Sequence, residues 1–204
     1  LNPRTNLRDD EYGGTAENRL RFLREVLNSV RQAVGDGMAV GLRVSIGEES
    51  EGGLSADEGL EVLAMMRGEV LFDYVSVVAG TSATVAGSDH IVPPMTMVSG
   101  YTVPLARRVK EVVDVPVMVA GRINQPQDAE RYLSSGDADA VVMTRALICD
   151  PEMPAKAAAG AVDDIRACIG CNQSCIGHFH LGYPISCIQH PETGRELTYG
   201  VRLR

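Results

Sequence analysis

Short apolar runs alternate with amphipathic stretches along most of this chain, and that alternation restricts the fold more than any other feature. We expect buried strands at Met38–Ile46, Asp73–Ala79, Val115–Ala120 and Ala138–Met143. Apolar residues at helical spacing precede or follow them, which predicts helices over Ala16–Val34, Ala56–Met66, Tyr101–Val113 and Pro126–Ser134. Strands and helices that alternate in this way predict an α/β fold with a parallel sheet.

Several helix ends carry local signals. Thr15 can cap the first helix, and Gly35 can end it. Ser55 and Glu58 have the spacing of a capping box, in which each residue satisfies a backbone N–H of the other. Pro126 suits the first turn of its helix, because that turn leaves its N–H groups unpaired.

The four strand–helix units amount to roughly half of a (β/α)8 TIM barrel. Alternation alone does not separate a barrel from a doubly wound open sheet. Open sheets that bind dinucleotides carry G-x-G-x-x-G after a strand, and no predicted strand here is followed by that motif. The absence favours the barrel. From Asp150 onward the pattern changes to short helical pieces and a Gly- and Cys-rich segment without a clear period.

Bulk composition excludes some classes of function. The net charge is −8, with acidic and basic residues interspersed, whereas a nucleic-acid binder needs a basic face. The longest apolar runs are too short to span a bilayer, so no membrane contact is expected. The start at Leu1 is polar, without an initiator Met or a visible signal peptide. We therefore expect a cytoplasmic protein, and a chain taken from within something longer.

Four of the five cysteines follow the pattern Cys168-x2-Cys171-x3-Cys175-x11-Cys187. Three thiolates within a tight loop and one distant thiolate suit a [4Fe–4S] cluster, which needs ligands from several directions. Structural zinc more often uses two separated C-x2-C pairs, and an odd count argues against a complete disulfide framework; both remain alternatives. Cys149 stands apart, and we expect it to be a buried structural thiol.

Arginines mark the ends of two successive predicted strands, as Gly121-Arg122 and Thr144-Arg145. In barrels, the loops after the last two strands often hold a phosphate, so these four residues are candidate phosphate ligands. The alternative is that both arginines pair with surface carboxylates. Arg43 lies inside an apolar strand, where a buried cation needs an anionic or electron-rich partner. A flavin ring would serve, and so would a structural ion pair.

The segment Gly80–Met95 is expected to be a long loop at the active end of the barrel. It carries Asp89 and His90, and a histidine there could protonate or orient a substrate. A solvated histidine without a catalytic role is the alternative.

These residues match a known family. Asp10-Glu11-Tyr12-Gly13-Gly14-Thr15-Ala16-Glu17-Asn18-Arg19, followed by Arg21-Phe22, resembles the D-E-Y-G-G-S-x-E-N-R-x-R-F signature of old yellow enzyme relatives. The resemblance continues at Gly121–Ile123, Gly136–Asp139 and Arg145–Ile148. Cys168–Cys175 resembles the cluster motif of bacterial 2,4-dienoyl-CoA reductase, and trimethylamine dehydrogenase has one residue fewer between its second and third cysteines.

The resemblance implies that residues 1–160 are the second half of a flavin-binding barrel, and that 161–204 bind the cluster and lead toward a further domain. It implies FMN and a [4Fe–4S] cluster, with FAD and NAD(P)H in the full-length protein. By position, Arg43 would face the flavin pyrimidine edge, and Gly121, Arg122, Thr144 and Arg145 would hold the phosphate. The segment after Gly80 departs from the reductase's Trp-His-Glu pattern, so Asp89 and His90 are catalytic candidates by place only.

Three hypotheses for function follow. The first is an FMN- and cluster-dependent reductase of the 2,4-dienoyl-CoA reductase type, which reduces an enone or unsaturated acyl thioester with NAD(P)H. The second is an amine dehydrogenase or N-demethylase that passes electrons from flavin to cluster. The third is an inactive half-barrel. The expected partners are a small-molecule substrate and either another copy of the chain or a chain that complements the half-barrel.

Overall fold

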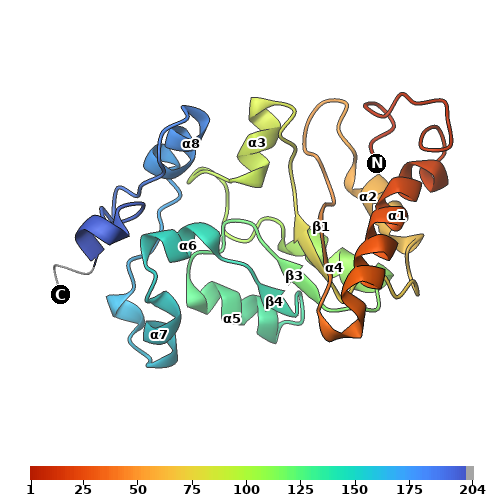
Figure 1. Cartoon of the computed structure of the whole chain (residues 1–204). Helices are drawn as coiled ribbons and strands as arrows, with labels where there is room; N and C mark the ends of the chain where they lie inside the picture. The colour runs from red at the N-terminus through yellow and green to blue at the C-terminus, as the bar shows by residue number, and fades with distance from the viewer. Residues whose placement is uncertain (201–204) are drawn as a thin grey trace.

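The computed structural model describes residues 1–200, and a four-stranded parallel sheet lies at its centre (Figure 1). The strands are β1 (Gly41–Ser45), β2 (Tyr74–Val78), β3 (Val117–Val119) and β4 (Ala140–Val141). Their order in the sheet is their order in the chain, with each pair parallel. The predicted α/β class and parallel sheet are therefore confirmed.

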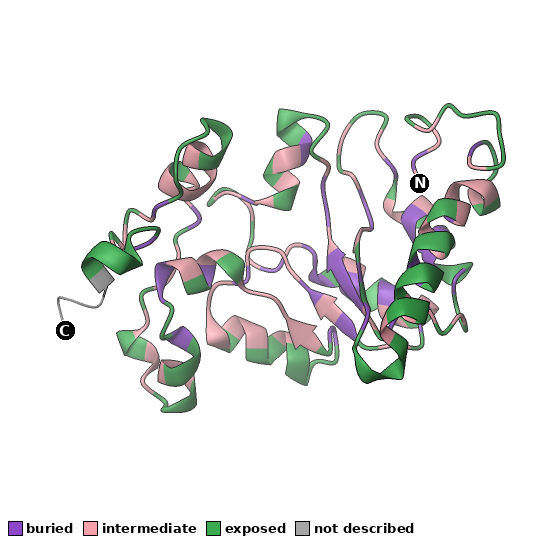
Figure 2. Cartoon of the chain, viewed as in Figure 1, coloured by how far each residue is buried: buried purple, intermediate pink, exposed green. Residues whose placement is uncertain are grey.

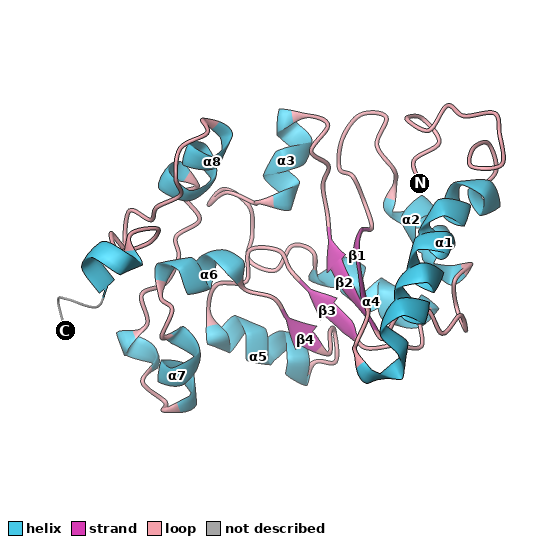
Figure 3. Cartoon of the chain, in the orientation of Figure 1, coloured by secondary structure: helices cyan, strands magenta, loops and turns pink. Residues whose placement is uncertain are grey.

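Helices connect and flank the strands (Figure 3). They are α1 (Ala16–Val34), α2 (Ala56–Ala64), α3 (Val85–Ile91), α4 (Val103–Val112), α5 (Pro126–Ser134), α6 (Thr144–Cys149), α7 (Met153–Ala158) and α8 (His178–His180). The predicted helix caps are confirmed. The Thr15 hydroxyl accepts a hydrogen bond from the Asn18 N–H at 3.2 Å. Ser55 and Glu58 form the reciprocal capping box, and α5 begins at Pro126.

The two faces of the sheet differ in what covers them. Figure 2 shows buried residues along the strands of the sheet. Leu42, Val75 and Val117 are paired neighbours on the helix-covered face, and all three are buried. One position along each strand, Arg43, Ser76 and Met118 form the next row and point to the opposite face. The apolar core between the helices and the sheet is drawn from residues 20–138.

The predicted strands were too long at their ends. Met38–Ile46, for example, contains a ladder only over Gly41–Ser45. An apolar run marks burial, but a strand ends where its neighbour stops offering backbone partners. The prediction of a continuous loop over Gly80–Met95 was wrong, since α3 lies inside it. Thr84 caps that helix by accepting from the Gly87 N–H at 2.9 Å.

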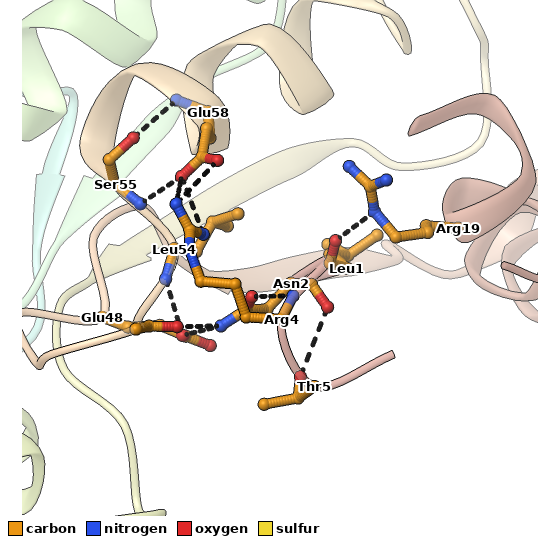
Figure 4. A network of polar contacts seen from close by, with 10 residues as sticks. Leu1, Asn2, Arg4, Thr5, Arg19, Glu48, Leu54, Ser55 and Glu58 are labelled. Atoms are coloured by element: carbon orange, nitrogen blue, oxygen red, sulfur yellow. Dashed lines mark hydrogen bonds and ion pairs between the residues drawn. The ribbon is translucent and has the colours of Figure 1, made fainter. Parts of the chain in front are cut away.

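The N-terminal residues are held against the loop between β1 and α2 (Figure 4). Asn2 is buried, and its side-chain amide donates to Glu48 Oε2 at 2.6 Å and to the Gly52 carbonyl at 3.1 Å. The same Glu48 oxygen accepts from the Leu54 N–H at 2.7 Å. Arg4 pairs with Glu58 of the capping box at 3.1 Å. This network fixes the loop that follows β1.

Residues 161–200, which we name the cysteine segment, contain short helical turns and no strand. They lie at the end of the molecule opposite α1 (Figure 1). The last four residues of the predicted cluster-binding region 161–204 lie outside the described residues. None of the helices within residues 1–200 combines the length and the hydropathy that a bilayer crossing requires.

Candidate functional site

A cavity of about 360 Å³ opens where the strands end. Its lining includes all five residues predicted to contact a flavin: Arg43, Gly121, Arg122, Thr144 and Arg145. They come from β1, from the turn after β3 and from the first turn of α6. We name this space the arginine cavity. Three guanidinium groups on one cavity make it suited to an anion.

Arg122 is fixed by the backbone around it. It adopts a positive φ of 52°, and its Nη1 donates to the Met97 carbonyl. Its Nε is buried without a hydrogen-bond partner in the described part of the chain. Neither Arg122 nor Arg145 pairs with a carboxylate there, so the surface salt bridges considered from the sequence are not formed within residues 1–200. The unpartnered Nε leaves donor capacity for a ligand.

The glycine before Arg122 is required by packing. A Cβ atom at Gly121 would collide with the hydroxyl of Thr102. Thr102 is fully buried at the start of α4, and its Oγ1 donates to the Ala120 carbonyl at 2.9 Å. Thr102 was not singled out from the sequence. Its hydroxyl ties α4 to the end of β3 and so places the Gly121–Arg122 turn at the cavity.

Arg43 differs from the prediction in one respect. We expected a buried cation, but its side chain is exposed and makes no hydrogen bond or ion pair within residues 1–200. The reason is that it points to the face of the sheet that the helices do not cover, while its neighbour Leu42 packs into the core. The expected alternation along β1 is therefore correct, and the expected burial was wrong.

Arg145 is half-buried between the arginine cavity and a second, smaller cavity. Burial lowers the pKa of its guanidinium, and the nearby Cys168 and Cys175 oppose that shift. Its Nη1 donates to Asn172 Oδ1 at 2.6 Å. Arg145 therefore faces two neighbouring sites at once.

The second cavity is lined by all four cysteines of the predicted cluster motif, Cys168, Cys171, Cys175 and Cys187. We name it the cysteine cavity. All four are partly buried free thiols. Ser186 N–H donates to the Ser174 carbonyl at 2.8 Å, which brings the distal Cys187 beside the loop of the other three. Burial raises the pKa of the Cys175 thiol.

Cys149 and two histidines of the cysteine segment lie outside these cavities. Cys149 is buried as expected, and burial, followed by Cys187 and Cys168, raises the pKa of its thiol to about 12. His178 and His180 do not line the cysteine cavity, and His178 Nδ1 lies 3.0 Å from the Pro184 carbonyl. Within residues 1–200, no three His, Cys, Asp or Glu side chains are grouped as ligands of a single metal ion.

The two catalytic candidates are on α3 and do not reach the arginine cavity. Asp89 is exposed. The ring of His90 lies 5.8 Å from that of Tyr101, centroid to centroid, and its Nδ1 is buried without a partner in the described residues. Tyr101 donates its phenol to the His90 carbonyl, and burial raises the pKa of that phenol. Ile91 and Val92 line the cavity in their place.

The model of the NADH:flavin oxidoreductase / NADH oxidase family matches residues 1–164. This chain belongs to that family. Members of this flavin-dependent oxidoreductase family are enzymes, and the resemblance noted in the sequence is confirmed.

Relatives within this family match nearly the whole chain. The N,N-dimethylglycine/sarcosine dehydrogenase of Chromohalobacter salexigens is 40% identical over 95% of this chain and 28% of its own length. The structure of 6-hydroxypseudooxynicotine amine oxidase from Pseudomonas geniculata is similar with a TM-score of 0.88 at 33% identity, covering 98% of this chain and 29% of that one. A 2-naphthoyl-CoA reductase complex has a TM-score of 0.85 at 32% identity, covering 96% and 29%.

Two facts follow from these matches. The chain spans less than a third of each relative's length. The structural neighbours are TIM-barrel flavoenzymes, and the four parallel strands of this family member correspond to part of such a barrel. The barrel that the sequence favoured over an open sheet is confirmed in this partial form.

Proposed function

We propose that the arginine cavity binds FMN, with the phosphate against Gly121, Arg122, Thr144 and Arg145. The observation that carries this proposal is the meeting of these four residues and Arg43 on one cavity. The unpartnered Nε of Arg122 supplies a donor that no residue of the described chain uses. Membership of a flavin-dependent family supports the choice of cofactor.

Arg43 would then lie at the flavin pyrimidine edge, as the family resemblance implies. It has no protein partner within residues 1–200, and its fork of donors is free to contact a planar ring. When bound, FMN supplies hydride transfer. Arg43 would favour the negative charge that the reduced ring gathers, because a fixed cation near that charge lowers its free energy.

The cysteine cavity is proposed to hold a [4Fe–4S] cluster through Cys168, Cys171, Cys175 and Cys187. Four free thiols line one cavity, yet no three are placed as ligands of one ion in the described part of the chain. Structural zinc more often uses two separated C-x2-C pairs, whereas three cysteines within eight residues and one distal cysteine suit a cubane. The sequence spacing therefore favours the cluster over zinc. When bound, the cluster supplies one-electron transfer.

For the whole protein we propose an NAD(P)H-dependent reductase of an enone or unsaturated acyl thioester, of the 2,4-dienoyl-CoA reductase type, located in the cytoplasm. The 2-naphthoyl-CoA reductase among the structural neighbours supports the thioester class. FAD would be a further cofactor of the full-length protein. Asp89 and His90 remain candidates for proton transfer, although α3 holds them away from the arginine cavity. The proposal also includes a second copy or a complementing chain against the uncovered face of the sheet.

Amine dehydrogenation or N-demethylation is the second candidate. It is favoured by the 40% identity to the dimethylglycine/sarcosine dehydrogenase and by the amine oxidase structure. Anaerobic absorbance spectra of the holoenzyme separate the two. We expect NAD(P)H to bleach the flavin and a 2-enoyl thioester to restore it. Bleaching by an N-methylated amine, with no response to NAD(P)H, would establish the second candidate instead.

The FMN site has its own test. In the full-length protein with its flavin removed, Arg145→Ala should weaken FMN binding about tenfold or more, because a charged hydrogen bond to phosphate contributes roughly 1.5–3 kcal/mol. Riboflavin lacks the phosphate, so its affinity should not change. Equal FMN affinity in the variant and the parent, measured by fluorescence titration, would move the phosphate elsewhere.

A further inference from the structure

Asn172 lies between the arginine cavity and the cysteine cavity and bonds to elements that border both. Its Oδ1 accepts from Arg145 Nη1 at 2.6 Å, and its Nδ2 donates to the Val92 carbonyl at 2.7 Å. Val92 lines the arginine cavity, and Asn172 itself lines the cysteine cavity. One amide group thus connects α6, the loop after α3 and the cysteine segment.

The orientation of that amide is determined by its partners. A guanidinium only donates hydrogen bonds and a carbonyl only accepts them, so Oδ1 must face Arg145 and Nδ2 must face Val92. An aspartate would lose the donor to Val92 and would pair with Arg145 as an anion. The site therefore distinguishes asparagine from its closest isostere.

The backbone at Asn172 also restricts the residue. Its φ is 56° and its ψ is 8°, a left-handed conformation that glycine and asparagine adopt most readily. Its carbonyl accepts from the Gly177 N–H at 2.8 Å, which closes the turn that carries Cys175.

The orientation of the Arg145 side chain depends on its contact with Asn172. The bond to Asn172 is the sole hydrogen bond of its side chain within residues 1–200. A long, half-buried side chain with one anchor samples few orientations while that anchor holds and many when it is removed. The remaining donors of the guanidinium are left free toward the arginine cavity.

We infer that Asn172 is a positioning residue that aims the Arg145 guanidinium at the phosphate of bound FMN. The inference rests on the proposed FMN site and adds to it a residue from the cysteine motif itself. Loss of the Asn172 amide should leave the phosphate site formed but its main cation poorly aimed. Asn172 does not line the arginine cavity, so binding of the flavin ring should not change.

Asn172→Gly tests this, since glycine keeps the left-handed backbone and removes only the amide. In the full-length protein with its flavin removed, the variant should bind FMN about threefold to tenfold more weakly than the parent. That is the range expected for one hydrogen bond that orients a charged group. Riboflavin affinity should stay at the parent value. Gln173→Gly, at the adjacent exposed position, is the matched control and should bind both flavins normally. Asn172→Asp should weaken FMN further, because its carboxylate competes with the phosphate for Arg145.

A double variant separates positioning from a general structural role. If Asn172 acts through Arg145, then Asn172→Gly should cost no FMN affinity in an Arg145→Ala background. Equal weakening of FMN and riboflavin, or additive losses in the double variant, would overturn the inference. An Arg145→Ala protein with unchanged FMN affinity would refute the phosphate site and this inference together. A sensitive Arg145→Ala with an insensitive Asn172→Gly would refute the inference alone.

Discussion

The sheet with its helices and the cysteine segment are held in place by different means. The first region buries a continuous apolar core drawn from residues 20–138. In the cysteine segment, Gly170, Ser186 and Thr193 are the buried residues among those described, and none has a large apolar side chain. Phe179, Leu181 and Tyr183 are each at least 60% exposed. Burial of apolar area stabilises the sheet, and the segment lacks that source of free energy.

Polar contacts attach the cysteine segment to the rest of the chain. The Asn124 amide donates to the Cys168 carbonyl, and the Arg166 N–H donates to Asp150 Oδ2 at 2.9 Å. Thr193 Oγ1 donates to the Ile148 carbonyl at 3.1 Å. Each such bond contributes only about 1 kcal/mol net. The segment therefore has few stabilising contacts of its own, and we predict that the proposed group at its thiols adds to its stability, as metals do in small metal-binding domains.

The largest expected effect is on the cysteine segment. Cys187→Ser removes the distal thiol, so anaerobically purified protein should lose most of its iron, from about four per chain. Limited proteolysis should then cut within residues 161–200 while the sheet resists. Ser134→Ala, at an exposed position of α5 that does not line the cysteine cavity, is the control and should keep its iron. One zinc ion per chain in place of iron would contradict the proposed [4Fe–4S] cluster in the cysteine segment.

The sheet should respond to a different change. Leu63→Ala truncates a core side chain of α2 that is only 1% exposed. Such truncations lower the free energy of unfolding by about 2–5 kcal/mol. The iron content of the folded protein should not change. Leu133→Ala, at a 37% exposed position in α5, should cost far less in the same chemical denaturation measurement. Iron loss in Leu63→Ala before the sheet unfolds would mean that the two regions are not independent.

The smallest expected effect lies at the junction of the two regions. Asp150 is buried, which raises its pKa, but Lys156 at 2.6 Å and the Arg166 N–H at 2.9 Å outweigh burial and hold the pKa below its usual value. Because the pKa of Asp150 is lower in the folded than in the unfolded state, its ionised carboxylate stabilises the fold above the unfolded-state pKa of about 4. This stabilisation is lost as the pH falls through the folded-state pKa. The protection factors of backbone amides near Arg166, which correct for the intrinsic exchange rate at each pH, should therefore fall in acid by roughly 1–2 kcal/mol.

Asp150→Asn should remove most of that pH dependence in hydrogen-exchange mass spectrometry. Asp139→Asn is a suitable control, since Asp139 pairs with Lys110 at 2.7 Å on the sheet side and does not contact the cysteine segment. Protection near Arg166 that stays constant from neutral to acidic pH in the parent would remove Asp150 as the link.

Features that depend on neighbouring residues were predicted from the sequence more accurately than features that depend on distant ones. Helix caps at Thr15 and Ser55 and the helix start at Pro126 were correct, because each depends on a few neighbouring residues. Strand ends were less accurate, since they depend on distant partners. The exposure of Arg43 could not be predicted, because it depends on which face of the sheet the helices cover. α3 was missed in a Gly- and Ser-containing stretch without helical spacing of apolar residues, although Thr84 was a usable capping signal.

At the candidate site, arginines at two strand ends and one inside an apolar strand were enough to select five of the residues that line the arginine cavity. They were not enough to find Asn172 or Thr102, whose importance lies in contacts across long stretches of chain. The available signal was an asparagine next to Cys171, because asparagine tolerates the left-handed conformation that the structure has there. The chemical role of the selected residues stays a prediction until the flavin and iron measurements are made.

The contact between Gly121 and Thr102 has a consequence for engineering. Because any Cβ at position 121 meets the Thr102 hydroxyl, a saturation library at position 121 alone should return almost only glycine. A paired library at both positions should recover alanine or serine at 121 together with a smaller residue at 102. The two positions should therefore show strong epistasis, and neither can be optimised by single-site screening.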